Sequence, residues 1–186
     1  MRTWFLAAVV TAAAPGLLAV RQPVRARNAM VVTREPHSTD VGVAILQAGG
    51  NAVDAAVAVG LALAVTHPSA GNLGGGGFML VRFADGRSTF VDFRERAPLA
   101  ATRNMYLAAD GRATDESVVG YLAAGVPGTV RGLELAHRQY GRKPWADLVT
   151  PAVELAAKGF PVSYSLARSL RSKCEVFERF PESKRI

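Results

Sequence analysis

Arg94 is the residue whose type and position most readily suggest binding chemistry. It follows the end of a strand expected over 88–93, and a glycine run, 71–77, opens the preceding strand of the same hairpin. A guanidinium can hold a carboxylate through two parallel hydrogen bonds. Strand alternation puts Asp92 on the same side as Arg94 and points Glu95 away. The residues alone leave two interpretations open: a clamp for a ligand carboxylate, or an exposed arginine paired with Asp92.

The glycine run does not match a phosphate-binding motif. The dinucleotide pattern G-x-G-x-x-G would need glycine at the position of Met79. The P-loop pattern fails as well, because Gly77 and Phe78 stand where it requires lysine and then serine or threonine. We therefore expect a tight backbone path that packs against another layer, at positions where side chains do not fit.

The other reactive side chains of the sequence lack partners. Cys174 is the single cysteine, so an intrachain disulfide and a cysteine metal cluster are excluded. The spacing of His37, His67 and His137 suggests no serine or cysteine partner, and the G-x-S-x-G nucleophile pattern is absent. The sequence therefore predicts no catalytic residue, no metal site and no cofactor in this chain.

The composition is that of a globular protein. Of the 186 residues, 49% are hydrophobic and 20% charged, which argues against a disordered chain. The net charge of +7 raises the question of nucleic-acid binding, but the basic residues are scattered. They form no run of five or six and do not alternate with aromatic residues, so we expect a solvated basic surface and no nucleic-acid partner.

Two helices and a short strand are expected before the glycine run. The strand covers 29–33, and the first helix covers 40–48 after a threonine cap. The second helix begins after an Asn51 cap, with Asp54 suited to its positive N-terminal end, and continues to about Val65. This second helix is rich in alanine and valine and poor in charge, which predicts a buried element that other layers approach closely.

A hairpin with an Asp-Gly turn follows the glycine run. Beyond it we expect a short strand over 121–124 and a helix over 129–140. Another helix is expected over 151–158, opened by a threonine cap and a proline, and a last helix over 165–176. This order predicts a layered α/β fold. The strands are too few for a complete two-layer sheet, so a partner segment is expected outside this chain.

The first residues have the features of an export signal. Arg2 precedes an apolar stretch, and small residues near Ala19 suit a signal peptidase. A membrane anchor and a buried first helix are the alternatives, but the segment is short for a span and is interrupted at Pro15. We expect removal of 1–19, a linker over 20–28, and export to the periplasm or the outside of the cell, without membrane attachment after cleavage.

Five motifs carry a resemblance to a known family. In chain order they are GGNAVDAAVA at 49–58, THPSAGNLGGGGFM at 66–79, DFRERAP at 92–98, GVPGTVRGLELAHRQYG at 125–141 and PAVELAAKGFPV at 151–162. Together they resemble the N-terminal part of the gamma-glutamyltranspeptidases, also called glutathione hydrolases. The resemblance covers about 29–162, and we expect 29–186 to be the N-terminal portion of the large subunit.

The resemblance implies a fold, an activity and one binding residue. The family has the four-layer αββα sandwich of the N-terminal-nucleophile hydrolases, and this chain would build it only in part. Its members transfer the γ-glutamyl group of glutathione and other γ-glutamyl compounds to water or an amino acid. The resemblance assigns Arg94, in Asp92-Phe93-Arg94-Glu95, to the α-carboxylate of that group.

The resemblance also implies what this chain lacks. The family's precursor cuts itself, and the new N-terminal threonine of the small subunit is the nucleophile. That threonine has no counterpart here, so we expect a missing C-terminal part or small subunit as partner. Within the family, a cephalosporin acylase or a capsule depolymerase is the alternative. A non-catalytic remnant that binds carboxylates is the alternative from another class.

Overall fold

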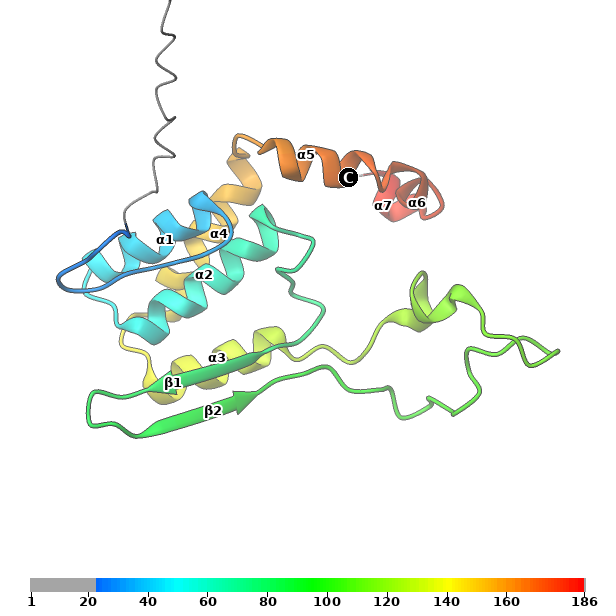
Figure 1. Cartoon of the computed structure of the whole chain (residues 1–186), viewed down its shortest axis with the longest axis horizontal. Helices are drawn as coiled ribbons and strands as arrows, with labels where there is room; N and C mark the ends of the chain where they lie inside the picture. The colour runs from blue at the N-terminus through cyan, green and yellow to red at the C-terminus, as the bar shows by residue number, and fades with distance from the viewer. Residues whose placement is uncertain (1–22, 186) are drawn as a thin grey trace, which may run out of the picture.

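The computed structural model describes residues 23–185, so the expected signal segment 1–19 lies outside the described residues. A group of helices lies against a two-stranded sheet, and a largely irregular stretch between β2 and α3 and the short C-terminal helices extend away from them (Figure 1). The main helices are α1 (Pro36–Gln47), α2 (Ala52–Thr66), α3 (Thr129–Tyr140) and α4 (Trp145–Lys158). The strands are β1 (Phe78–Arg82) and β2 (Ser88–Asp92). The predicted layered α/β arrangement is confirmed in this partial form.

Helix α2 is the centre of the helical layer and contacts α1, α3 and α4. Its side chains are small and apolar, and Val57, Ala58 and Ala62 are fully buried. The predicted start is confirmed, because the Asn51 side chain accepts hydrogen bonds from the first amides of the helix. The predicted end is confirmed too, since His67 is the C-cap and the residue before a proline avoids helical geometry.

Helix α1 begins four residues before the predicted position 40. Glu35 is the N-cap, and its carboxylate accepts from the Ser38 backbone N–H at 3.2 Å. Pro36 occupies the first turn, where its missing N–H has no helical partner to lose. The strand predicted over 29–33 is wrong, since that segment is irregular. Within residues 23–185 neither β1 nor β2 pairs with this segment, and a strand needs a pairing partner for its backbone groups.

The hairpin forms as predicted and pairs Phe78 with Asp92 and Arg82 with Ser88 in antiparallel register. Gly86 adopts a φ of 88° in its turn, a value that favours glycine. Val91 is buried, and half-buried side chains beside it complete the face that packs against the helical core. The alternation expected for β2 is thereby confirmed, and the opposite face of the hairpin is exposed.

Helix α4 begins at Trp145, six residues before the predicted start at 151. Pro151 therefore lies inside the helix, where it removes one backbone hydrogen bond. Leu148 explains why the helix tolerates this loss, because its side chain is fully buried in the core. Packing thus outweighed the local proline signal. The predicted end is confirmed, since Gly159 is the C-cap with a φ of 75°.

The remaining segments are short helical turns and irregular chain. The strand predicted over 121–124 is wrong: residues 121–123 form a 3₁₀ turn, η2 (Tyr121–Ala123), after η1 (Asp115–Ser117). The helix predicted over 165–176 is divided into α5 (Tyr164–Arg171) and α6 (Cys174–Glu178), followed by α7 (Pro181–Arg185). The rings of Tyr121 and Phe180 contact each other edge to face, with their centroids 6.1 Å apart.

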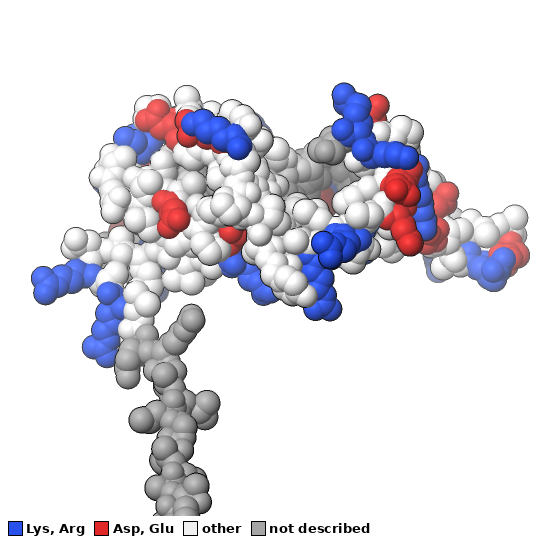
Figure 2. Space-filling view, turned by 90° about the horizontal axis from the view of Figure 1, so that it is seen from above, with Lys and Arg blue, Asp and Glu red and all other residues white. Residues whose placement is uncertain are grey.

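Charged side chains are spread over the surface. On the face shown in Figure 2, basic side chains lie over the body and the C-terminal helices, with acidic side chains beside several of them. This distribution matches the scattered charge of the sequence. Within residues 23–185, no helix is both long enough and apolar enough to cross a membrane.

Candidate functional site

The glycine loop, residues 71–77, is fixed by hydrogen bonds to the start of α3. The backbone N–H groups of Gly128 and Thr129 donate to the Gly75 carbonyl at 2.8 and 3.1 Å. The Asn72 side-chain oxygen accepts from the Gly75 N–H at 3.0 Å and from the Thr129 hydroxyl. The predicted tight path against another layer is therefore present, and α3 is that layer.

Phe93 joins the glycine loop to the hairpin. Its N–H donates to the Gly77 carbonyl at 3.0 Å, which continues the ladder by one pair beyond β2. Its ring lies against Gly77 on one side and Gly132 of α3 on the other, so closely that a side chain at Gly132 would collide with it. This packing fixes the backbone immediately before Arg94.

Arg94 lies at the outer edge of this assembly. Its Nε is 3.0 Å from Oε2 of Glu95, and its guanidinium lies 5.7 Å from the centre of the Phe78 ring. Its side chain is 58% exposed. Among the described residues no hydrogen bond involves Nη1 or Nη2. One edge of the guanidinium is therefore held, and the other can receive the two oxygens of a carboxylate.

The ion-pair partner of Arg94 differs from the sequence expectation. Asp92 was expected to face Arg94, with Glu95 pointing away. The structure pairs the guanidinium with Glu95 instead, while the Asp92 carboxylate accepts the Arg94 backbone N–H at 3.0 Å. The reason is that β2 ends at Asp92 and the ladder continues only to Phe93, so the alternation of side chains no longer applies at Arg94 and Glu95.

Glu95 connects the arginine to the glycine loop. A Cβ at Gly76 would collide with the Glu95 carboxylate and with its backbone N–H, so glycine is needed there for close approach. The pKa of Glu95 is lowered, first because its own backbone N–H donates to the carboxylate and then because Arg94 is positively charged. The carboxylate is therefore ionised at neutral pH and can hold the guanidinium. Strand alternation gave no signal for this role.

A hollow of about 490 Å³ adjoins the loop between α2, α3 and β1. The Arg94 guanidinium lies on Phe78, which contributes to the wall of this hollow. Arg34 and His67 also line this hollow. Within residues 23–185 no cluster of three or more histidine, cysteine or acidic side chains could hold a metal ion. The arrangement is suited to binding an anion at its edge.

Comparison with known proteins identifies the family. A family model described as Gamma-glutamyltranspeptidase matches residues 38–186. The chain belongs to the gamma-glutamyltranspeptidase family. The resemblance stated from the five motifs is thereby confirmed.

Curated relatives of this gamma-glutamyltranspeptidase chain are several times longer. It is 54% identical over 162 residues to the glutathione hydrolase proenzyme of Pseudomonas sp. (strain A14). This match covers 87% of this chain and 28% of the relative. It is 52% identical over 169 residues to the glutathione hydrolase proenzyme of Escherichia coli (strain K12), with coverage of 90% and 29%. The chain therefore spans less than a third of the length of these relatives.

Solved structures give the same result for the fold. The gamma-glutamyltranspeptidase of Helicobacter pylori superposes with a TM-score of 0.85 at 44% identity, covering 88% of this chain and 47% of that chain. A cephalosporin acylase from Bacillus halodurans superposes with a TM-score of 0.70 at 28% identity, covering 85% and 30%. The partial α/β fold is thus shared by two solved proteins whose names indicate different activities.

Proposed function

We propose that this chain is the substrate-anchoring part of an exported γ-glutamyltransferase or glutathione hydrolase, and that Arg94 binds the α-carboxylate of the γ-glutamyl group. The observation that carries the proposal is that the Arg94 guanidinium is hydrogen-bonded on one edge only among the described residues. Glu95 binds its Nε at 3.0 Å, and no described residue bonds to its two terminal nitrogens. Membership of the gamma-glutamyltranspeptidase family supports the choice of substrate.

The contribution of this chain to catalysis is position. A planar guanidinium held on one edge by Glu95 and lying over the Phe78 ring is restrained in orientation. Once the guanidinium binds the α-carboxylate, the length of the glutamyl chain sets its distance to the γ-carbonyl carbon. Holding two reacting groups at a fixed separation removes much of the entropic cost of their encounter.

The nucleophile of the proposed reaction is a threonine outside this chain. Its hydroxyl oxygen attacks the γ-carbonyl carbon, and its own amino group takes the proton. The amide bond to the leaving amine breaks, the amine receives the proton, and an acyl-threonine ester remains. Water or an amino-acid amine then breaks that ester and restores the threonine. Precursor self-cleavage, a small-subunit partner and removal of 1–19 belong to the same proposal.

The experiment replaces the matching part of the Escherichia coli relative with residues 38–186 and measures hydrolysis of a γ-glutamyl anilide. In this chimaera Arg94→Lys should raise KM about tenfold or more, because a lysine cannot form two parallel hydrogen bonds to the carboxylate. Self-cleavage, followed on a gel, should proceed as in the unsubstituted chimaera.

Arg87→Lys is the matched control for this experiment. Arg87 lies in the turn of the same hairpin, is 77% exposed, pairs with Asp85 at 2.8 Å and lies 5.4 Å from the centre of the Phe83 ring. Its replacement should leave KM unchanged. An equal KM for the Arg94→Lys chimaera and its parent would count against the assignment of Arg94.

An acylase is the second candidate, because the cephalosporin acylase structure superposes on most of this chain. A glutaryl group has the same length as a γ-glutamyl group but lacks the α-amine. The chimaera should be assayed with matched glutaryl and γ-glutamyl anilides. A higher kcat/KM for the glutaryl compound would favour the acylase, and the reverse would favour the γ-glutamyltransferase.

A non-catalytic carboxylate-binding chain is the candidate from another class. It predicts that the 186-residue chain by itself binds L-glutamate, and that the chimaera hydrolyses no substrate although it cleaves itself. Isothermal titration of the chain with L-glutamate, combined with the chimaera assay, separates this candidate from the enzyme.

A further inference from the structure

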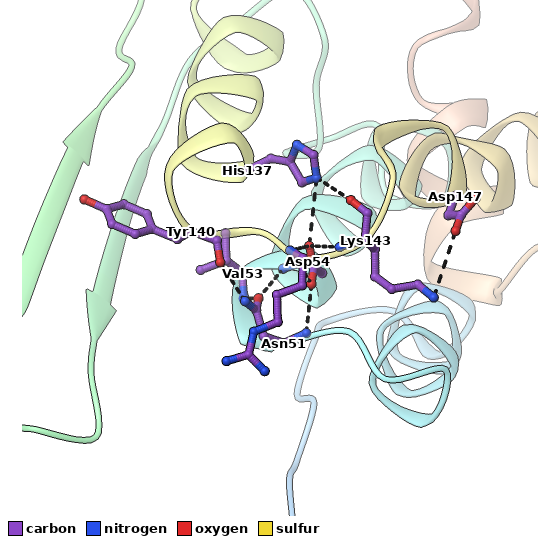
Figure 3. Close-up of polar contacts among 8 residues, drawn as sticks. Asn51, Val53, Asp54, His137, Tyr140, Lys143 and Asp147 are labelled. Atoms are coloured by element: carbon purple, nitrogen blue, oxygen red, sulfur yellow. Dashed lines mark hydrogen bonds and ion pairs between the residues drawn. The ribbon is translucent and has the colours of Figure 1, made fainter.

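A fully buried carboxylate lies at the start of α2, far along the chain from Arg94. Asp54 has no solvent exposure, and its Oδ2 accepts the Asn51 backbone N–H at 2.8 Å (Figure 3). Both its oxygens also accept from the Arg142 N–H, at 3.0 and 3.1 Å, and Oδ1 accepts from the Lys143 N–H at 3.3 Å. One carboxylate therefore binds the start of α2 and the turn that follows α3.

Asn51 makes the same connection with its side-chain amide. Its Oδ1 accepts from the N–H groups of Val53 and Asp54 at 2.9 and 3.0 Å, which caps α2. Its Nδ2 donates to the Tyr140 carbonyl at 2.6 Å. Tyr140 is the last residue of α3, where carbonyls have no partner inside the helix. The pair thus satisfies the N-terminal end of one helix and the C-terminal end of another.

His137 closes this junction from the α3 side. Its Nε2 donates to the Lys143 carbonyl at 2.7 Å and lies 4.0 Å from Oδ1 of Asp54. The backbone at Gly141 approaches so closely that a Cβ there would collide with the His137 ring and with Asp54. The turn after α3 is consequently held by side chains from both helices.

The opposite end of α3 touches the candidate site. Gly128 and Thr129 bond to the glycine loop there, and Gly132 lies against Phe93. A helix of 12 residues is about 18 Å long, so α3 reaches from the Asp54 junction to the glycine loop. It is therefore a direct physical link between Asp54 and the backbone that precedes Arg94.

We propose that Asn51 and Asp54 form one cap shared by α2 and α3, and that through α3 they are positioning residues for the glycine loop and Arg94. The alternative is that the pair only starts α2. The link to substrate rests on the proposed function of Arg94, whereas the link from the shared cap to the glycine loop is independent of it.

Hydrogen exchange of the full 186-residue chain tests the independent part. Asp54→Asn should speed exchange of the Arg142 and Lys143 amides by about tenfold or more, because the neutral amide keeps one weaker acceptor oxygen and its NH2 group cannot accept a hydrogen bond. The distinguishing expectation concerns the far end of α3: the Gly128 and Thr129 amides should also exchange faster. Normal exchange at those two amides would overturn the positioning role.

Two further variants distinguish the positioning role from a general loss of stability. Asn51→Ser keeps a hydroxyl that can cap α2 but is too short to reach the Tyr140 carbonyl, so it should reproduce the far-end effect even if Asp54→Asn does not fold. Asp147→Asn is the matched control, because Asp147 is 51% exposed and meets only the Lys143 ammonium at 4.0 Å. Faster far-end exchange in Asp147→Asn, or none in Asn51→Ser, would count against the shared cap.

A double substitution tests the link to substrate in the chimaera described above. Asn51→Ser should raise KM for the γ-glutamyl anilide severalfold with a smaller change in kcat. In an Arg94→Lys background it should raise KM no further, since both changes act through the same contact. Additive effects on KM would refute this link. If Arg94→Lys alone leaves KM unchanged, the proposed function fails while the exchange result stands.

Discussion

The helical layer and the hairpin differ in how completely they bury their apolar side chains. In the helical layer Val57, Ala58 and Leu148 have no exposed surface. On the outer face of the hairpin Leu80 is 73% exposed and Phe90 is 58% exposed, although both are large and apolar. The helical layer encloses a core of fully buried side chains, although Val153 of α4 is 57% exposed, whereas the hairpin is covered on one face only.

The region that provides most of the stability is therefore not the region that carries the candidate site. Stability resides in α1 to α4, where burial of apolar surface is the dominant favourable term. Arg94 lies on the less buried region, beside an exposed aromatic face formed by Phe78 and Phe90, whose rings stack at 5.5 Å. Such a face is typical of a surface that another layer or partner covers.

The largest expected effect tests where the stability resides. Leu148→Ala should lower the free energy of unfolding by about 2–5 kcal/mol, because it leaves a cavity at a fully buried position. Leu80→Ala removes the same atoms from the exposed hairpin face and should change it by about 0.5 kcal/mol or less. Urea unfolding followed by circular dichroism measures both. Equal losses would show that the two regions form one core.

An intermediate effect is expected at the contact between the glycine loop and the hairpin. Gly76→Ala forces a methyl group against Glu95 and should cost about 1–3 kcal/mol, the usual range for overpacking. Gly74→Ala is the matched control, because a Cβ there would meet no atom within 4 Å. The same urea measurement compares them. If Gly76→Ala were as stable as Gly74→Ala, the loop would be too mobile to position Arg94.

The smallest effect concerns the exposed ion pair of Arg94. The pKa of Glu95 is lowered in the folded chain from an ordinary value of 4.5. The small contribution of the ionised Glu95 carboxylate to stability is therefore present above pH 4.5 and is lost as the pH falls through the folded pKa. Titration of the Glu95 carboxyl carbon by NMR should give a midpoint below 4.5, and Arg94→Gln should raise that midpoint. A midpoint at or above 4.5 would contradict the pairing.

Local sequence signals predicted the elements that depend on local chemistry. The Asn51 cap, the end of α2 before Pro68, the Asp-Gly hairpin turn and the α4 end at Gly159 all agree with the structure. Errors occurred where packing or pairing opposed the local signal. The Thr150-Pro151 pair predicts a helix start, but burial of Leu148 extends α4 through it.

The candidate site shows the same division. The sequence by itself determined that an arginine closely follows a strand that pairs beside a glycine loop, because residue types and strand signals depend only on near neighbours. Only the tertiary structure decided that Glu95 holds that arginine, and that Asp54 binds the turn after α3, 88 residues away. The first contact joins adjacent residues and follows from where the strand pairing of β2 ends. The second depends on how α3 packs against α2, and no spacing along the chain encodes that placement.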